Sequence, residues 1–234
     1  MTGFFMAWGM FCAIPCPRKV WDSDKYPHML LAFPWIGLMI GLLWALVGLG
    51  AAKLGLLGAA LMAVLPSLLS GFIHLDGFMD CADAVLSRRE LEKRRAILKD
   101  SHVGAFAVIA FGLWGLLGFA AFASFDVRRA LPVLAFIPAV CRGCSAVAVL
   151  SFAPMSTSGY AKLPESVKPR HKWLALGETM IFAAAAVLAG GVMGCAAVFG
   201  GLGSWCAIHV LRRDLQGIAA IFPAAPSPWA SFAP

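Results

Sequence analysis

The feature that most constrains this chain is a set of long apolar runs without a single charged residue. Three of these runs cover 29–52, 54–73 and 103–125. A helix needs about 20 apolar residues to cross the ~30 Å hydrocarbon core of a bilayer, so each run predicts a membrane span. The 234 residues are 61% hydrophobic and 13% charged, whereas soluble domains carry about 25% charged residues. We therefore predict an all-α, polytopic integral membrane protein.

Two further regions bring the prediction to about six spans. A fourth span, 130–152, is interrupted only by Arg142. The uncharged run 179–208 is too long for one helix, and its many glycines permit the sharp turn of a helical hairpin. We therefore predict a fifth and a sixth span at 174–190 and 192–210.

The ends of this single domain, 1–234, are predicted to lie outside the spans. The N-terminus, 1–28, is cytoplasmic or interfacial, and within it 4–14 is either an interfacial or re-entrant segment or an extra partial span. No secretory signal is predicted, because no basic start precedes the apolar stretch and no small-residue cleavage pattern follows it. The segment 211–234 is predicted to be an irregular tail.

The distribution of Lys and Arg predicts the orientation. With six spans and the N-terminus inside, fifteen of the nineteen basic residues fall in cytoplasmic loops and only Lys53, Arg128 and Arg129 outside. Positive side chains resist translocation, so the site described next faces the cytoplasm of a bacterial or archaeal cell (inner) membrane. The net charge of +7 suits an anionic leaflet or phosphate-bearing substrates, or it is purely topogenic. No nucleic-acid partner is expected.

The loop between the second and third spans carries an acidic stripe. Asp76, Asp80 and Asp83 are spaced four and three apart, so on a helix they share one narrow face. Like charges on adjacent turns repel, and Mg²⁺ prefers oxygen ligands alongside substrate phosphates. Because their neighbours are apolar, we predict a divalent-metal site rather than acids displayed to water. The following stretch, 87–95, alternates charges like an ordinary solvated helix.

The stretch "KDSHVG", 99–104, adds groups suited to phosphate and metal. Asp100 is predicted to complete the metal set, and Lys99 and Ser101 are placed to hold phosphate oxygens where a helix begins. Arg142 is a guanidinium part-way along a membrane helix, where a charge is costly. It faces either a phosphate ligand or a structural partner such as an aspartate of the stripe.

Histidines and cysteines offer weaker signals. His74 is a candidate general base, since histidine titrates near neutral pH, or it is an interfacial hydrogen-bonder; the same alternatives hold less favourably for His102. Cys141 and Cys144 form a lone C-x-x-C without further metal ligands, which favours helix packing. No Walker loop, G-x-S-x-G or H-E-x-x-H occurs, so metal-bridged diphosphate chemistry fits best.

The motifs "HLDGFMDCADAVLS" and "ILKDSHVGAFAV" resemble those of the cobalamin synthase family of adenosylcobinamide-GDP ribazoletransferases. The family pattern runs H-L-D-G-x-x-D-x-x-D-G and then M-K-D-S-x-x-G-x-x-G. The resemblance extends to "MFCAIPCP", "FPWIGLMIG" and "AVCRGCS". It therefore covers most of the chain.

The resemblance implies a transferase that joins adenosylcobinamide-GDP to α-ribazole or its 5′-phosphate and releases GMP, in the last steps of cobalamin biosynthesis. It implies Mg²⁺ as cofactor, held with the diphosphate by Asp76, Asp80, Asp83 and Asp100. By the same resemblance, Lys99, Ser101 and Arg142 contact phosphate oxygens, and an aspartate or His74 accepts the proton of the ribazole hydroxyl. Further expected partners are the bilayer and either other cobalamin-assembly proteins or a second copy of the chain.

The chain departs from the family pattern in several places. Ala84 and Ala107 stand where glycines are usual, and His102 where Arg or a similar residue is usual. After "RRDLQGI" the family continues with a G-G-x-T-G-D type motif and a further membrane helix, whereas this chain reads "AAIFPAAPSPWASFAP". A frameshifted or truncated copy would end in this way, and it would be inactive if the missing aspartate belongs to the site.

Rival functions require features that this sequence lacks. A CDP-alcohol phosphotransferase would carry Ala-Arg after its Asp-Gly and two later aspartates, and an aspartate-rich prenyltransferase a second acidic cluster, but the loop 153–172 offers only Glu165. That loop is either a substrate cover or a plain connector. A transporter would show charges in several spans, and we find only Arg142. A structural membrane subunit is the remaining alternative.

Overall fold

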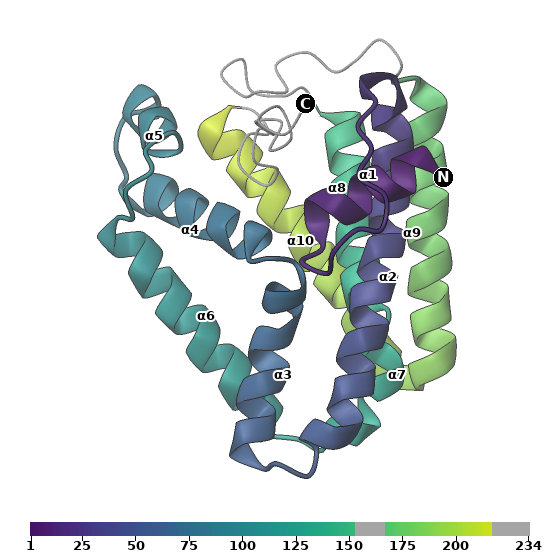
Figure 1. The fold of residues 1–234 in the computed structure, drawn as a ribbon. Coiled ribbons are helices and arrows are strands. Elements are labelled where there is room, and N and C mark those ends of the chain that lie inside the picture. The colour runs from purple at the N-terminus through teal and green to yellow at the C-terminus, as the bar shows by residue number, and fades with distance from the viewer. Residues whose placement is uncertain (153–166, 217–234) are drawn as a thin grey trace.

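The computed structural model describes residues 1–152 and 167–216, and these form helices and turns (Figure 1). The α-helices are α1 (Thr2–Phe11), α2 (Tyr26–Ala51), α3 (Leu56–Leu69), α4 (Ile73–Leu86), α5 (Leu91–Ile97), α6 (Ala105–Ala123), α7 (Leu131–Leu134), α8 (Ile137–Ser151), α9 (Pro169–Gly190) and α10 (Cys195–Leu215). Three short 3-10 helices are η1 (Ser23–Lys25), η2 (Val127–Arg129) and η3 (Gly191–Gly194). The predicted all-α class is confirmed for the described residues.

Several of these helical stretches are long and apolar enough to cross a membrane. Within the described residues there are four such stretches, or five if the bent pair α3 and α4 counts as one. The four are Ser23–Ala51, Ala105–Ala123, Leu131–Ser151 and Pro169–Leu215. The chain is therefore a multi-pass helical membrane protein, as its uncharged runs predicted.

The longest stretch contains the predicted helical hairpin. α9 ends at Gly190, and Gly191 adopts a φ of 57°, a left-handed conformation that glycine adopts without steric cost. A side chain on Gly194 would collide with the backbone of Ala186, so a glycine is needed where the chain folds back. α9 and α10 then run in opposite directions (Figure 1).

The second predicted span, 54–73, is not one continuous helix. α3 ends at Leu69 after 14 residues, about 21 Å at 1.5 Å per residue, which is shorter than the ~30 Å hydrocarbon core. Gly71 and Phe72 adopt φ values of 64° and 60°, and α4 leaves at 93° to α3. The uncharged run did not predict this bend, because hydropathy depends on composition and not on the direction of the backbone.

The N-terminal helix α1 lies across α2 (Figure 1). Its 10 residues measure about 15 Å, too short to cross the bilayer completely, so α1 is not a further full span. Met6, Ala7 and Phe11 of α1 are buried against α2 in the largest hydrophobic cluster. α1 is therefore part of the packed core.

The described helices form two groups. α2 packs closely on α8, since a side chain on Gly37 or Gly41 would collide with the backbone of 134–139, and α9 and α10 complete this bundle. α3, α4, α5 and α6 form a second group that stands beside it (Figure 1). α6 buries only Ala107.

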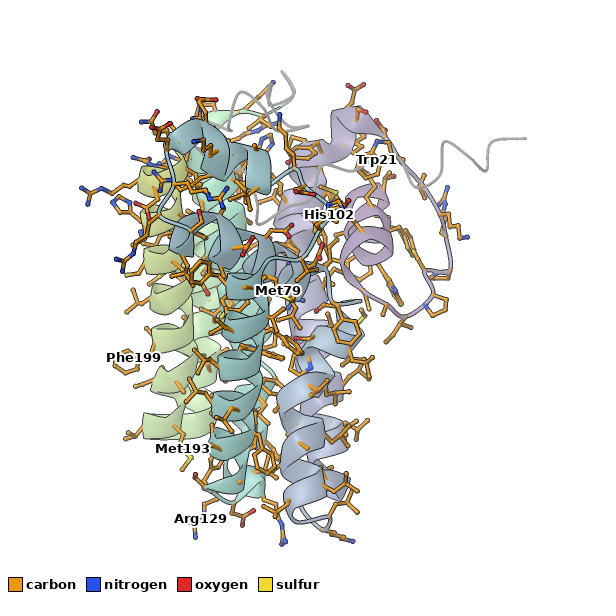
Figure 2. All side chains as sticks on the ribbon, turned by 90° about the vertical axis from the view of Figure 1, so that its left-hand side faces the viewer. Trp21, Met79, His102, Arg129, Met193 and Phe199 are labelled. Atoms are coloured by element: carbon orange, nitrogen blue, oxygen red, sulfur yellow. The ribbon has the colours of Figure 1, made fainter. Side chains whose placement is uncertain are left out.

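Charged side chains gather at one end of the molecule, which we call the charged end. Figure 2 shows them around α4, α5 and His102, whereas Arg129 lies at the opposite end. Apolar side chains such as Met193 of η3 and Phe199 of α10 point outwards between the two ends (Figure 2). This separation is typical of a protein surrounded by lipid along its middle.

Candidate functional site

The acidic stripe lies on α4, which leaves the second span at the bend. The buried residues of α4 are Gly77, Cys81 and Ala84, each one position after an aspartate of the stripe. One residue is a rotation of about 100° on a helix, so the stripe runs along the edge of the packed face. Asp76 is exposed, and Asp80 and Asp83 are half-buried. The predicted common face for the three carboxylates therefore exists, and it is reachable from water.

Repulsion within the stripe is visible at its middle member. Partial burial, followed by the charges of Asp76 and Asp83, raises the pKa of Asp80 from 3.8 to about 6. In the described residues no Lys or Arg lies within ion-pair distance of these three carboxylates. A bound cation would relieve this repulsion, because an opposite charge favours the ionised carboxylate.

The second predicted motif lies against the first. Gly104 caps the N-terminus of α6, and the carboxylate of Asp83 occupies the space that a side chain at Gly104 would need. Glycine is therefore required at this position for the two motifs to meet. The N-terminus of α6 also favours the nearby negative charge of Asp83. Lys99 and Ser101 are exposed on the loop just before α6.

Asp100 is engaged with His102 rather than with the stripe. Its Oδ1 accepts a hydrogen bond from the His102 backbone N–H at 3.0 Å and lies 2.6 Å from the His102 Nδ1. These hydrogen bonds hold the pKa of Asp100 below its usual value. Both side chains are exposed.

The structure therefore does not assemble the predicted set of four metal ligands, Asp76, Asp80, Asp83 and Asp100. Among the described residues, no group of three or more His, Cys, Asp or Glu side chains is close enough to hold one ion. The donors still fit Mg²⁺, which is usually bound through one or two carboxylates, with waters and substrate phosphates completing its shell. The unpaired, mutually repelling carboxylates of α4 are such donors.

A cavity of about 440 Å³ opens beside the first aspartate of the stripe. It lies between the C-terminal end of α1 and the bend between α3 and α4, and Cys12, Ser70, Gly71 and Asp76 are among its lining residues. A backbone hydrogen bond from Ala13 N to Leu69 O, 2.8 Å long, fixes the loop after α1 to the end of α3. The bend thus builds the cavity that a straight span would not contain.

Arg142 of α8 lies buried behind this cavity. Its Nη2 donates a 2.7 Å hydrogen bond to the Ser70 Oγ, and its guanidinium lies 5.6 Å from the centre of the Phe33 ring. The buried Nε has no hydrogen-bond partner, and no described carboxylate forms an ion pair with Arg142. The structure gives Arg142 a hydroxyl partner rather than the aspartate that the structural alternative required.

His74, the predicted general base, is packed into the core. Its ring stacks on Phe11 at 5.9 Å and lies 5.8 Å from Phe33, and its Nε2 is buried without a partner. Burial, with a smaller effect of Arg142, lowers the pKa of His74 to about 3. A base with so low a pKa takes up protons poorly at neutral pH, so this environment favours a packing role.

Several residues at or near the site were not found from the sequence. Ser70 and Cys12 line the cavity, and Arg95, in the stretch expected to be only solvated, bonds to the end of α10. Glu178 of α9 is another ionisable residue inside a candidate span; its Oε2 is buried without a partner. The "MFCAIPCP" motif contains Cys12, so it was the one sequence feature that could have placed this segment at the cavity.

The remaining predictions concern cysteines and loops. Cys141 and Cys144 lie against Gly200 and Gly201 of α10, which agrees with helix packing. The predicted loop 153–172 falls mostly outside the described residues, and only its last part is seen, where α9 begins at Pro169. Of the predicted tail 211–234, the first five residues continue α10, and 217–234 lie outside the described residues.

Comparison with known proteins identifies the same family that the two central motifs resemble. Residues 3–219 match the family model described as cobalamin-5-phosphate synthase, CobS. An adenosylcobinamide-GDP ribazoletransferase from Clostridium perfringens is 42% identical over 161 residues, which are 67% of this chain and 64% of that protein. Proteins of the same name from Carboxydothermus hydrogenoformans and Desulfitobacterium hafniense are 30% and 34% identical over 185 and 173 residues.

The extent of these matches differs between relatives. The Carboxydothermus match covers 78% of this chain and 72% of that protein, and the Desulfitobacterium match 72% and 68%. The chain spans slightly less than two thirds of the length of the clostridial relatives that it matches. No solved structure matches the chain. Because the family model covers nearly all of it, including α4 and the start of α6, this chain belongs to the cobalamin-5-phosphate synthase family.

Proposed function

We propose that this chain is a Mg²⁺-dependent membrane transferase that joins adenosylcobinamide-GDP to α-ribazole or its 5′-phosphate and releases GMP. The observation that carries the proposal is that unpaired negative and positive side chains lie near the same cavity. Unpaired carboxylates on α4 meet a cavity that has a buried guanidinium without an acidic partner behind it. Relatives named adenosylcobinamide-GDP ribazoletransferase support the choice of substrates.

The residue roles follow from position. In this proposal Asp76, Asp80 and Asp83 would hold the cation and with it the diphosphate, and Asp100, on the loop before α6, is the fourth carboxylate of the predicted set. A bound Mg²⁺ would neutralise the diphosphate and stabilise the departing phosphate. Arg142 and Ser70 offer donors to phosphate oxygens near Asp76, while Lys99 and Ser101 offer donors on the side of Asp83.

The transfer itself is a substitution at phosphorus. The ribazole hydroxyl oxygen bonds to the phosphorus on the cobinamide side, the bond from that phosphorus to the oxygen bridging to GMP breaks, and GMP departs with that oxygen. The hydroxyl proton passes to an aspartate of α4. We prefer an aspartate to His74 because the His74 ring lies between Phe11 and Phe33.

The proposed membrane arrangement has six crossings with the charged end in the cytoplasm of a bacterial inner membrane. α9 and α10, of 22 and 21 residues, are each about 30 Å long, so each can cross once. α2, α6 and α7 with α8 make three more crossings. The sixth crossing is made by α3 together with the bend that follows it, and α4 turns along the membrane surface where nucleotide substrates arrive.

The direct test is product formation in membranes that contain this chain. Adenosylcobinamide-GDP, α-ribazole and Mg²⁺ are added, and GMP and cobalamin are separated chromatographically, with the Clostridium perfringens relative as positive control. We expect both products, and their loss when EDTA removes divalent ions. If the relative forms product and this chain forms none, the proposed activity is wrong for this chain. Formation of cobalamin at the full rate in EDTA would rule out the metal dependence.

A further inference from the structure

The two sides of the proposed site are carried by different helix groups. The aspartates, Lys99 and Ser101 belong to the group of α3, α4, α5 and α6, whereas Arg142 belongs to the α2, α8, α9 and α10 bundle. Away from the charged end the groups are joined by α2 against α3. At the charged end, α4 and α5 reach the bundle through α10 (Figure 1). The Arg142–Ser70 and Ala13–Leu69 hydrogen bonds join the groups at the bend, and the junction with α10 joins them beyond Asp83, so the spacing across the site depends on both.

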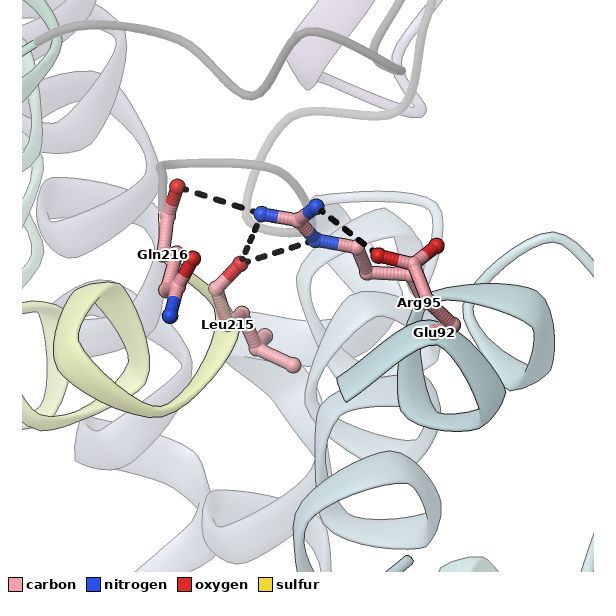
Figure 3. Close-up of polar contacts among 4 residues, drawn as sticks. All are labelled: Glu92, Arg95, Leu215 and Gln216. Carbon is pink, nitrogen blue, oxygen red and sulfur yellow. Dashed lines mark hydrogen bonds and ion pairs between the residues drawn. The ribbon is translucent and has the colours of Figure 1, made fainter. Parts of the chain in front are cut away.

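Arg95 of α5 makes the polar part of the junction (Figure 3). Its Nε and Nη2 donate hydrogen bonds of 3.2 Å and 3.1 Å to the Leu215 carbonyl oxygen, and Nη2 also donates to the Gln216 carbonyl at 3.5 Å. The last carbonyls of a helix have no partner within the helix, and they carry the negative end of its dipole. The Arg95 guanidinium donates hydrogen bonds to these carbonyls and offsets the negative end of the dipole, because its donors form a planar fork with a permanent positive charge.

Leu215 makes the apolar part of the same junction. Its side chain is 1% exposed and packs in one cluster with Ala84 of α4, which is fully buried. Ile97 and Leu98, immediately before Lys99, pack against that cluster. Ala84 directly follows Asp83, so the end of α10 contacts the chain beside both the stripe and the 99–101 loop.

We propose that Arg95 is a positioning residue. By holding the end of α10, it fixes Asp83 and the 99–101 loop relative to the Arg142 side of the site. This inference rests on the proposed transferase function. Arg95 itself touches no proposed substrate atom, so its contribution is to the placement of groups that do.

The chain offers matched variants for the test. Arg95→Gln removes the charge and the fork, and Arg95→Lys keeps the charge but loses the fork. Lys93→Gln removes the same charge from an exposed position two residues earlier on α5, and is the control. Each variant is assayed in membranes for turnover and for the Mg²⁺ concentration that gives half-maximal rate. Tryptic cleavage after the exposed Arg88 and Arg89 measures, without any activity, how firmly α4 and α5 are held.

We expect Arg95→Gln to raise the half-saturating Mg²⁺ concentration about tenfold or more, as loss of supporting contacts around metal ligands does, and to accelerate cleavage. Arg95→Lys should be intermediate, and Lys93→Gln should match wild type in both measurements. If Arg95→Gln also matches wild type in both, the positioning role is overturned while the transferase function stands. If wild type forms no product although its relative does, the transferase function fails instead, and the positioning role with it.

Discussion

The acidic stripe of α4 and the buried Arg142 of α8 hold their charges in opposite ways. Asp76 is exposed and Asp80 and Asp83 are half-buried, so water screens part of their repulsion. Arg142 is only 8% exposed and has one hydroxyl partner, Ser70. The comparison teaches that both regions hold charge that the fold leaves unbalanced, one at the surface and one in the core. Four substitutions test this comparison, from the largest expected effect to the smallest.

The largest effect is expected from Asp80→Asn. Turnover should fall about 100- to 1,000-fold, the usual cost of removing one preorganised polar group from a transition state. The thermal midpoint should stay unchanged or rise, because the substitution removes a repelling charge. Product assays and unfolding in detergent measure the two effects. Asp126→Asn, at the opposite end of the molecule, is the control, and comparable losses in both variants would contradict a special role for the stripe.

Arg142→Met tests the buried side of the comparison. Turnover should fall about 100-fold through loss of a phosphate donor, while the thermal midpoint should hold or rise, because replacing a buried, unpaired charge with an apolar side chain removes its desolvation cost. Arg142→Lys should not restore turnover, since lysine lacks the guanidinium fork. A lower thermal midpoint with normal turnover would show that Arg142 is structural.

Gly104→Ala probes the contact between the two motifs. The added Cβ would occupy the place of the Asp83 carboxylate, so the half-saturating Mg²⁺ concentration should rise about tenfold. Gly112→Ala is the matched control, because it lies on the same helix with nothing within 4 Å of an added Cβ. Equal behaviour of the two variants in Mg²⁺ titrations of the rate would place Asp83 outside the metal site.

The smallest effect concerns stability in acid. Burial lowers the pKa of His74 to about 3 from an unfolded value near 6.5, so between these pH values the unfolded chain binds the extra proton. Stability contributed by neutral His74 is therefore complete above pH 6.5 and falls by up to about 1.4 kcal/mol per pH unit below it. His74→Phe keeps the stacking and cannot titrate. Its thermal midpoint should drop less than that of wild type between pH 7 and pH 5; equal drops would show that His74 does not titrate in this way.

The helices and the site differ in how well the sequence predicted them. Uncharged runs predict spans because crossing hydrocarbon requires about 20 apolar residues, and the helices α2, α6 and α8 lie within or near those runs. The hairpin at Gly191 followed from excess length and glycine. Asp76, Asp80 and Asp83 share a face because helix periodicity is local.

The missed features depend on contacts between distant segments. Ser70 and Arg142 are 72 residues apart, and Arg95 and Leu215 are 120 residues apart. No local sequence pattern indicates either contact. His74 was a candidate base because histidine titrates near neutral pH, but burial, followed by the charge of Arg142, lowers its pKa, and its ring packs against Phe11 and Phe33 of other helices.

The sequence by itself therefore determined the class of protein, most of its apolar helices, the acidic stripe and, through two motifs, the family. These properties depend on composition and on spacing over a few turns, which one stretch of chain carries alone. Only the tertiary structure decided that the second span bends at Gly71 and Phe72, that a cavity opens there, that the His74 ring packs between Phe11 and Phe33, and that Arg95 holds α10. These properties depend on which surfaces meet after packing, because burial and hydrogen-bond partners belong to the assembled helices and not to any one of them.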